Sequence, residues 1–295
     1  MQVGHYAGPA ANALPAAVRR TLRKHPHLNR VVQVGRAVVH FGPWRHLVRA
    51  SLRVLHPPLA ADSSPASSLF PPLAPSSVAA ALGTDSVCVA GRLSPQVLGS
   101  IRAVTDQLPA GEYARFDEGN EDVYRLVRDE VATAVVREYF RAEPQLLECT
   151  LVVHETEDDA RTPLNAQRYF HFDYAGWQSL NLFIYLSDVA ADSGAHQIVT
   201  GSHRKKRLRD AVRPFLPDPE VERRFGERIR TIAGPAGTFF FENTEAFHRR
   251  LRMKQRRVML NVLYASHRGV LSGGRLAPTY AAYVRSTQSR PRPGT

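Results

Sequence analysis

The chain has 295 residues, 43% of them hydrophobic, and a formal net charge of +12. This length allows one large domain or two small ones with a sizeable core, and the two cysteines are too few for a disulfide-stabilised scaffold. The sequence contains no run of about 18 apolar residues that could span a membrane, and no secretion signal is evident. We therefore expect a cytoplasmic protein.

The net charge is concentrated at one end of the chain. The first acidic residue is Asp62, and the residues before it include nine of the 39 arginines and lysines. The remainder therefore has a net charge of about +3, which is ordinary for a domain of this size. No stripe of interleaved basic and aromatic residues follows, so the charge does not by itself predict a nucleic-acid partner. The oligomeric state stays open.

Residues 1–61 form a basic extension, and its pattern predicts amphipathic helices at Pro15–Lys24 and Trp44–Leu55. The second helix places apolar residues on one stripe and arginines on another (Trp44, Leu47, Val48, Leu52 and Leu55 against Arg45, Arg49 and Arg53). Such a helix can lie on an anionic membrane or bind an acidic partner. The commoner arrangement, which we favour, places the apolar stripe on the main domain and the arginines in water.

Residues 62–77 are rich in Ser and Pro and are typical of a linker. A main domain is expected over residues 78–285, followed by a flexible tail at 286–295. The domain begins with a short strand at 86–90 and a helix that starts at Ser94-Pro95. Apolar spacing of three and four then predicts one helix over 122–140.

From Leu146 onward the hydrophobic period changes from 3.6 to 2, which indicates strands. Eight strand candidates follow, separated by Gly, Pro, Asp and Ser: 147–154, 168–173, 180–187, 195–199, 228–232, 238–242, 247–251 and 257–265. This order predicts a mainly β fold with flanking helices, whose core is a double-sheet jelly roll, the cupin-like double-stranded β-helix.

The stretch RYFHFDYA contains a possible metal motif. His171 and Asp173 stand two apart in a predicted strand, so their side chains share one face. Two imidazoles and one carboxylate form the facial triad that holds Fe(II) and leaves other coordination positions open. His248 is the candidate for the second imidazole, because it starts a later strand after the turn 242–245. A His-x-Asp pair alone is a weak signal, and without further support a strand-edge ion pair is the better explanation of it.

Arg257 begins the last predicted strand, and it would point into the lumen of the barrel. A buried guanidinium requires an anionic partner and can hold a carboxylate through two hydrogen bonds. The dicarboxylate 2-oxoglutarate fits between such an arginine and an iron ion. Arg256 faces the opposite way, so only one of the two arginines can bind 2-oxoglutarate. The alternative is that the arginine is simply exposed at the end of the strand.

The ordered motifs FHFD, LFIYLSDV, SGAHQIVTGSH and GTFFFENTEAFH, followed by an arginine, resemble the phytanoyl-CoA dioxygenase family of Fe(II)/2-oxoglutarate oxygenases. The resemblance covers residues 78–268. It implies that His171, Asp173 and His248 bind the metal and that Arg257 binds 2-oxoglutarate. It further implies cosubstrate contacts from Tyr185 and Asn181, and a structural turn at 201–203.

The resemblance implies a hydroxylase that uses dioxygen and 2-oxoglutarate and releases succinate and CO2. Asp173 favours this chemistry, because halogenating relatives have Gly or Ala there. Basic and aromatic residues near the site, Arg168, Trp177 and Arg250, are candidates for binding a small, anionic or acyl-type substrate. The basic stretch HRRLRMKQ after His248 departs from the family pattern. Two alternatives remain: a catalytically silent binding module tethered by residues 1–61, and a nucleic-acid demethylase.

Overall fold

A computed structural model describes residues 43–59, 68–156, 168–211, 213 and 215–267, with isolated residues between 25 and 40 and between 280 and 285. The helix predicted at 15–24 and the tail at 286–295 lie outside this part of the chain. None of the described helices is long and apolar enough to cross a membrane.

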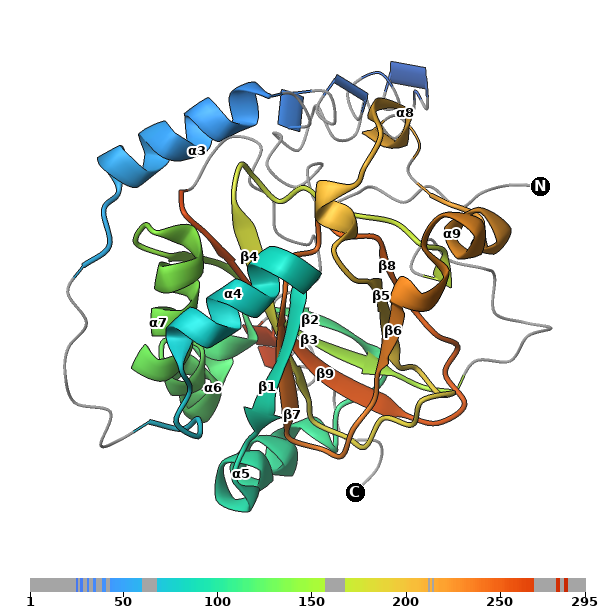
Figure 1. Ribbon diagram of the computed structural model, residues 1–295. Coiled ribbons are helices and arrows are strands. Elements are labelled where there is room, and N and C mark those ends of the chain that lie inside the picture. The colour runs from blue at the N-terminus through green and yellow to red at the C-terminus, as the bar shows by residue number, and fades with distance from the viewer. Residues whose placement is uncertain are drawn as a thin grey trace, which may run out of the picture.

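Two antiparallel sheets face each other and form the centre of the molecule (Figure 1). The larger sheet has the order β1-β7-β4-β9-β3-β2, and the smaller has the order β6-β5-β8. The strands are β1 (Val87–Arg92), β2 (Gly111–Ala114), β3 (Gln145–His154), β4 (Ser179–Tyr185), β5 (His196–Val199), β6 (Ile229–Ile232), β7 (Thr238–Glu242), β8 (His248–Arg250) and β9 (Arg257–Ala265). This arrangement confirms the predicted mainly β fold with a jelly-roll core.

One predicted strand, at residues 168–173, is not a regular strand in the structure. Residues 168–173 make only isolated bridges, in which Phe170 pairs with Leu216 and His171 pairs with His248. The His171 N–H donates to the His248 carbonyl over 2.9 Å, and the His248 N–H donates to the His171 carbonyl over 2.8 Å. The segment therefore extends the smaller sheet beside β8 without becoming a regular strand. The short strand β2 was not predicted.

The predicted helix at 122–140 is two helices, α6 (Glu121–Leu126) and α7 (Glu130–Phe140). Asp129 causes the break, because its side chain accepts a hydrogen bond from the Val131 N–H at 2.9 Å and so caps the start of α7. The same carboxylate accepts from the Leu69 N–H at 2.7 Å. The other helices are α3 (Trp44–Leu55), α4 (Pro75–Asp85), α5 (Pro95–Thr105), α8 (Leu208–Ala211) and α9 (Asp218–Phe225).

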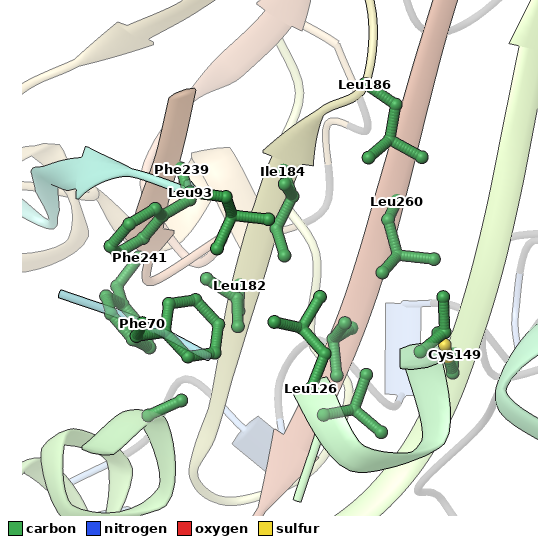
Figure 2. Packing of buried hydrophobic residues seen from close by; sticks show 14 of the residues in the cluster. Phe70, Leu93, Leu126, Cys149, Leu182, Ile184, Leu186, Phe239, Phe241 and Leu260 are labelled. Atoms are coloured by element: carbon green, nitrogen blue, oxygen red, sulfur yellow. The ribbon is translucent and has the colours of Figure 1, made fainter. Parts of the chain in front are cut away.

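The main hydrophobic core lies between the larger sheet and the helices that cover its outer face. Figure 2 shows Leu182, Ile184 and Leu260 of this sheet facing Leu126 of α6. Phe70, from the stretch expected to be a linker, packs edge-on against Phe239 with the ring centroids 4.9 Å apart. The described part of that stretch, from residue 68, thus contributes to the core of the barrel domain.

A second cluster fills the lumen, the space between the two sheets. It includes Phe183 and Tyr185 of β4, Phe240 of β7, Met259 of β9 and Ile198 of β5. Side chains alternate across each strand, so the residues of β4, β7 and β9 that do not face the helices face this lumen. The polar residues discussed below lie on the same inner face.

Candidate metal centre

Three predicted ligands converge at one end of the barrel. His171 and Asp173 come from the segment beside β8, and His248 is the first residue of β8. One potential ligand atom from each residue lies within 4.8 Å of the others. Within the described parts of the chain, this is the one group of His, Cys, Asp and Glu residues with metal-binding geometry. The donor set fits a 2-His-1-carboxylate metal site.

Backbone carbonyls orient both imidazoles. The Nδ1 of His171 lies 2.8 Å from the Tyr169 carbonyl, and the Nδ1 of His248 lies 2.9 Å from the Ala246 carbonyl. A proton on each Nδ1 would donate to these oxygens and leave the Nε2 lone pairs for a metal. The Nε2 of His248 lies 3.5 Å from a carboxylate oxygen of Asp173. The three side chains therefore present their ligand atoms to one point.

The turn before His248 ties the metal ligands to the larger sheet. The Thr244 carbonyl accepts a hydrogen bond from the Asp173 N–H at 2.8 Å, and the Thr244 hydroxyl donates to the side-chain oxygen of Asn181 at 3.2 Å. The Asn181 amide in turn donates to Asn261 at 2.8 Å. On the other side of the turn, the Ser202 hydroxyl accepts from the Phe247 N–H at 2.8 Å. Asn181, predicted to contact the cosubstrate, thus also supports the position of Asp173.

The sequence did not indicate a buried pair behind the metal site, Glu242 and His196. A carboxylate oxygen of Glu242, which is fully buried, lies 2.7 Å from Nε2 of His196, and the other lies 3.7 Å from Nδ1 of His248. The rings of His196 and His248 are stacked, with centroids 5.4 Å apart. The only signal in the sequence is an acidic residue ending an otherwise aromatic strand, FFFE. The pair places a buried carboxyl group and a third imidazole next to the metal ligands.

The two adjacent arginines point in opposite directions. Arg257 is 3% exposed and donates to the Gly194 carbonyl inside the barrel. Arg256 lies at the outer surface, where it binds Glu155 and the Leu108 carbonyl, the latter at 2.6 Å. Arg257 is therefore the lumen arginine, as the alternation along the strand predicted.

Tyr185 also lies in the lumen, but its hydroxyl is bound to backbone. It donates to the Ile232 carbonyl at 2.8 Å and accepts from the His196 N–H at 3.2 Å. Burial raises the pKa of Tyr185 to about 12, although the nearby Arg257 lowers it. The ring, not the hydroxyl, is thus the part of Tyr185 that remains for the predicted cosubstrate contact.

The three candidate substrate residues differ in position. Arg250 is buried on β8, two residues after His248 on the same face and across the strand pair from His196. Trp177 is half-buried, and its ring lies against His40 with centroids 4.8 Å apart. Arg168 is half-buried at the start of the metal-binding segment. A substrate role for these residues stays a prediction.

The two histidines of the site have opposite pKa shifts. Burial, together with the charge of His248, lowers the pKa of His171 to about 4. Burial also acts to lower the pKa of His248. The hydrogen bond that its ring donates to Asp173, and the charges of Glu242 and Asp173, outweigh burial and raise the pKa to about 8. At neutral pH His171 is therefore neutral and His248 is protonated in the metal-free protein.

Metal affinity should consequently depend on pH. A metal ion must displace the proton from His248, so the affinity rises about tenfold per pH unit below pH 8 and levels off above it. His171 adds no further dependence at these pH values, because it is already neutral. Calorimetric titration with Co(II) between pH 6 and 9 measures this slope. An affinity independent of pH over this range would contradict the raised pKa of His248.

Comparison with solved structures shows the same fold. HygX from Streptomyces hygroscopicus, with nickel and 2-oxoglutarate bound, matches with a TM-score of 0.50 and 17% identity, over 69% of this chain and 86% of HygX. The epimerase SnoN, in complex with Fe3+, alpha ketoglutarate and nogalamycin RO, matches with a TM-score of 0.50 and 16% identity, over 66% of this chain and 86% of SnoN. No protein-family model matches the chain, and no curated protein does.

Proposed function

We propose that this protein is a non-haem Fe(II)/2-oxoglutarate-dependent oxygenase that oxidises a small organic substrate and releases succinate and CO2. The observation that carries the proposal is the convergence of His171, Asp173 and His248 at one end of the lumen. A buried arginine in the same lumen, Arg257, supports it. The bound ligands in HygX and SnoN, which share the fold, are consistent with it.

His171, Asp173 and His248 would hold Fe(II), which with dioxygen and 2-oxoglutarate supplies the oxidising power. The guanidinium of Arg257 would bind the distal carboxylate of 2-oxoglutarate, and its burial strengthens that pairing because little water competes. The aromatic residues of the lumen cluster, Phe183, Tyr185 and Phe240, would exclude water from the cosubstrate. Asn181 and Thr244 keep the backbone of Asp173 in place.

For the reaction type we propose hydroxylation, because Asp173 supplies a carboxylate ligand. Halogenating members of the family that this chain resembles lack that ligand. For the substrate we propose an anionic or acyl-type molecule, on the strength of Arg250, which is buried two residues from a metal ligand. Its positive charge in that position favours a ligand with a carboxylate or phosphate group. Both described cysteines, Cys88 and Cys149, are free thiols, and this fits a reducing compartment such as the cytoplasm.

An anaerobic titration of the purified protein with Fe(II) and 2-oxoglutarate tests the proposed cofactors. We expect a visible metal-to-ligand charge-transfer band that needs both components and is absent when succinate replaces 2-oxoglutarate. A well-folded protein that gives no band would refute the oxygenase and favour a silent binding module. Once the band is established, coupled succinate release identifies substrates among anionic and acyl-type compounds.

A further inference from the structure

Helix α3 contacts the barrel through two of its arginines, which differs from the arrangement favoured from the sequence. Arg45 and Arg49 both form ion pairs with Glu245, in the turn between β7 and β8. Arg49 also donates to the Trp177 carbonyl, and Arg53 donates to the Phe140 carbonyl at 3.2 Å. The expectation that these arginines lie in water was therefore wrong for Arg45 and Arg49.

Glu245 is a buried anchor for a second segment as well. Lys206 donates to the Glu245 carbonyl at 2.7 Å and lies over the rings of Phe172 and Tyr174, 4.3 and 4.4 Å from their centroids. Burial acts to raise the pKa of Glu245, but the charges of Arg49, Arg45 and Lys206 outweigh this and lower it to about 2. The carboxylate thus stays ionised and binds α3, while the backbone carbonyl of the same residue binds Lys206, so α3 and the segment 204–209 are attached to the same end of the barrel.

Because α3 uses Arg45 and Arg49 for this contact, only Val48 and Leu52 of its apolar stripe are half-buried, and the other residues of the stripe face outward. Leu47, Val54 and Leu55 are 73%, 80% and 69% exposed, and Trp44 is also exposed. Eight of the eleven exposed large hydrophobic residues in the described parts of the chain fall within residues 28–59. The exposed apolar surface is therefore concentrated on this region rather than scattered over the molecule, which is the pattern of an interaction site.

Cations accompany these apolar residues. Arg204, Lys205 and Arg207 are exposed in the segment that Lys206 attaches to Glu245, and Leu208 beside them is 63% exposed. Figure 1 shows α8, which begins at Leu208, and α3 at the same end of the molecule. Residues 1–61 contain no acidic residue. The apolar side chains of α3 thus lie near a positively charged rim.

We propose that this surface, the outer face of α3 with segment 204–208, binds an anionic lipid bilayer peripherally. Leucine, valine and tryptophan side chains would enter the headgroup region, and the arginines and lysine would contact acidic lipids. A second copy of the chain is a poorer occupant, because two such surfaces would bring like charges together. The proposal is independent of the metal site, although the turn that holds α3 leads directly to His248.

Sedimentation with vesicles tests the proposal on the full-length protein. We expect binding to vesicles of phosphatidylcholine with 30% phosphatidylserine, little binding to pure phosphatidylcholine, and weakening in 0.5 M NaCl. The double variant Leu47→Ser/Val54→Ser should bind at least about tenfold more weakly, because two apolar side chains no longer leave water. Val89→Ser is the matched control, since Val89 is an exposed apolar residue on β1, and it should bind like the wild type.

Two further measurements keep the result interpretable. Circular dichroism and Co(II) affinity confirm that each variant is folded. A Trp177→Phe variant leaves Trp44 as the one tryptophan, and its emission should shift to the blue when the protein binds vesicles. Failure of the folded wild type to bind acidic vesicles would overturn the proposal. The proposal would also be overturned if the double variant bound vesicles as well as the wild type does. It would be overturned too if the wild type bound no lipid but sedimented as a dimer that the double substitution dissociates.

Discussion

His171→Ala and His248→Ala are each expected to lower the affinity for Co(II) or Fe(II) by at least about 100-fold and to abolish the charge-transfer band. Loss of a partner that only orients a ligand already costs about 10–100-fold in metal affinity, and these substitutions remove the ligand atom itself. The remaining two donors cannot complete a facial triad. Calorimetry with Co(II) under anaerobic conditions gives the affinity, and the visible spectrum with 2-oxoglutarate gives the band.

His196→Gln is the matched control for these variants. The ring of His196 stacks on that of His248, yet its Nε2 contacts Glu242, and His196 is not one of the three candidate metal ligands. Glutamine can still donate to the Glu242 carboxylate, so the variant should fold and keep its metal affinity within about tenfold. A loss as large as that of His248→Ala would show that His196 is a ligand and that the assigned triad is wrong.

Arg257→Ala is expected to weaken 2-oxoglutarate binding by roughly 30-fold or more, because removing one partner of a buried charge pair costs about 2–5 kcal/mol. The affinity for the metal alone should change far less, since Arg257 is not among the ligands. Titration of 2-oxoglutarate into the Fe(II)-loaded protein, followed by the charge-transfer band, separates the two effects. Arg257→Lys should restore part of the affinity, because lysine keeps the charge but not the two-pronged geometry.

Arg256→Ala is the control, because this arginine is adjacent in sequence but binds Glu155 at the outer surface. Surface ion pairs contribute about 0–1 kcal/mol, so the variant should be nearly as stable as the wild type and should bind 2-oxoglutarate normally. Equal losses in both variants would point to general destabilisation. A loss confined to Arg256→Ala would contradict the position of Arg257 as the cosubstrate anchor.

The sequence determined the elements that depend on local pattern. The period of two located the strands from β3 to β9, because alternation is imposed by the strand itself, and β1 was located as a short apolar run. It also placed Arg257 inside and Arg256 outside. Helix α3 begins and ends at the predicted residues, Trp44 and Leu55, since its amphipathic spacing is regular. The His171-x-Asp173 spacing, read with the motifs that follow it, was enough to nominate all three metal ligands.

The tertiary structure decided what depends on partners distant in the chain. The segment 168–173 is held by bridges to His248 and Leu216, so its strand-like composition did not produce a regular strand. The pairing of Glu242 with His196 joins strands of different sheets, and neither residue shows a local pattern.

The orientation of α3 is the clearest case, because both of its faces are plausible contact faces from composition alone. A single buried carboxylate, Glu245, 200 residues after Arg45, selected the face that carries Arg45 and Arg49. An ionised carboxylate inside a protein requires cationic partners, and that requirement outweighed full burial of the apolar stripe.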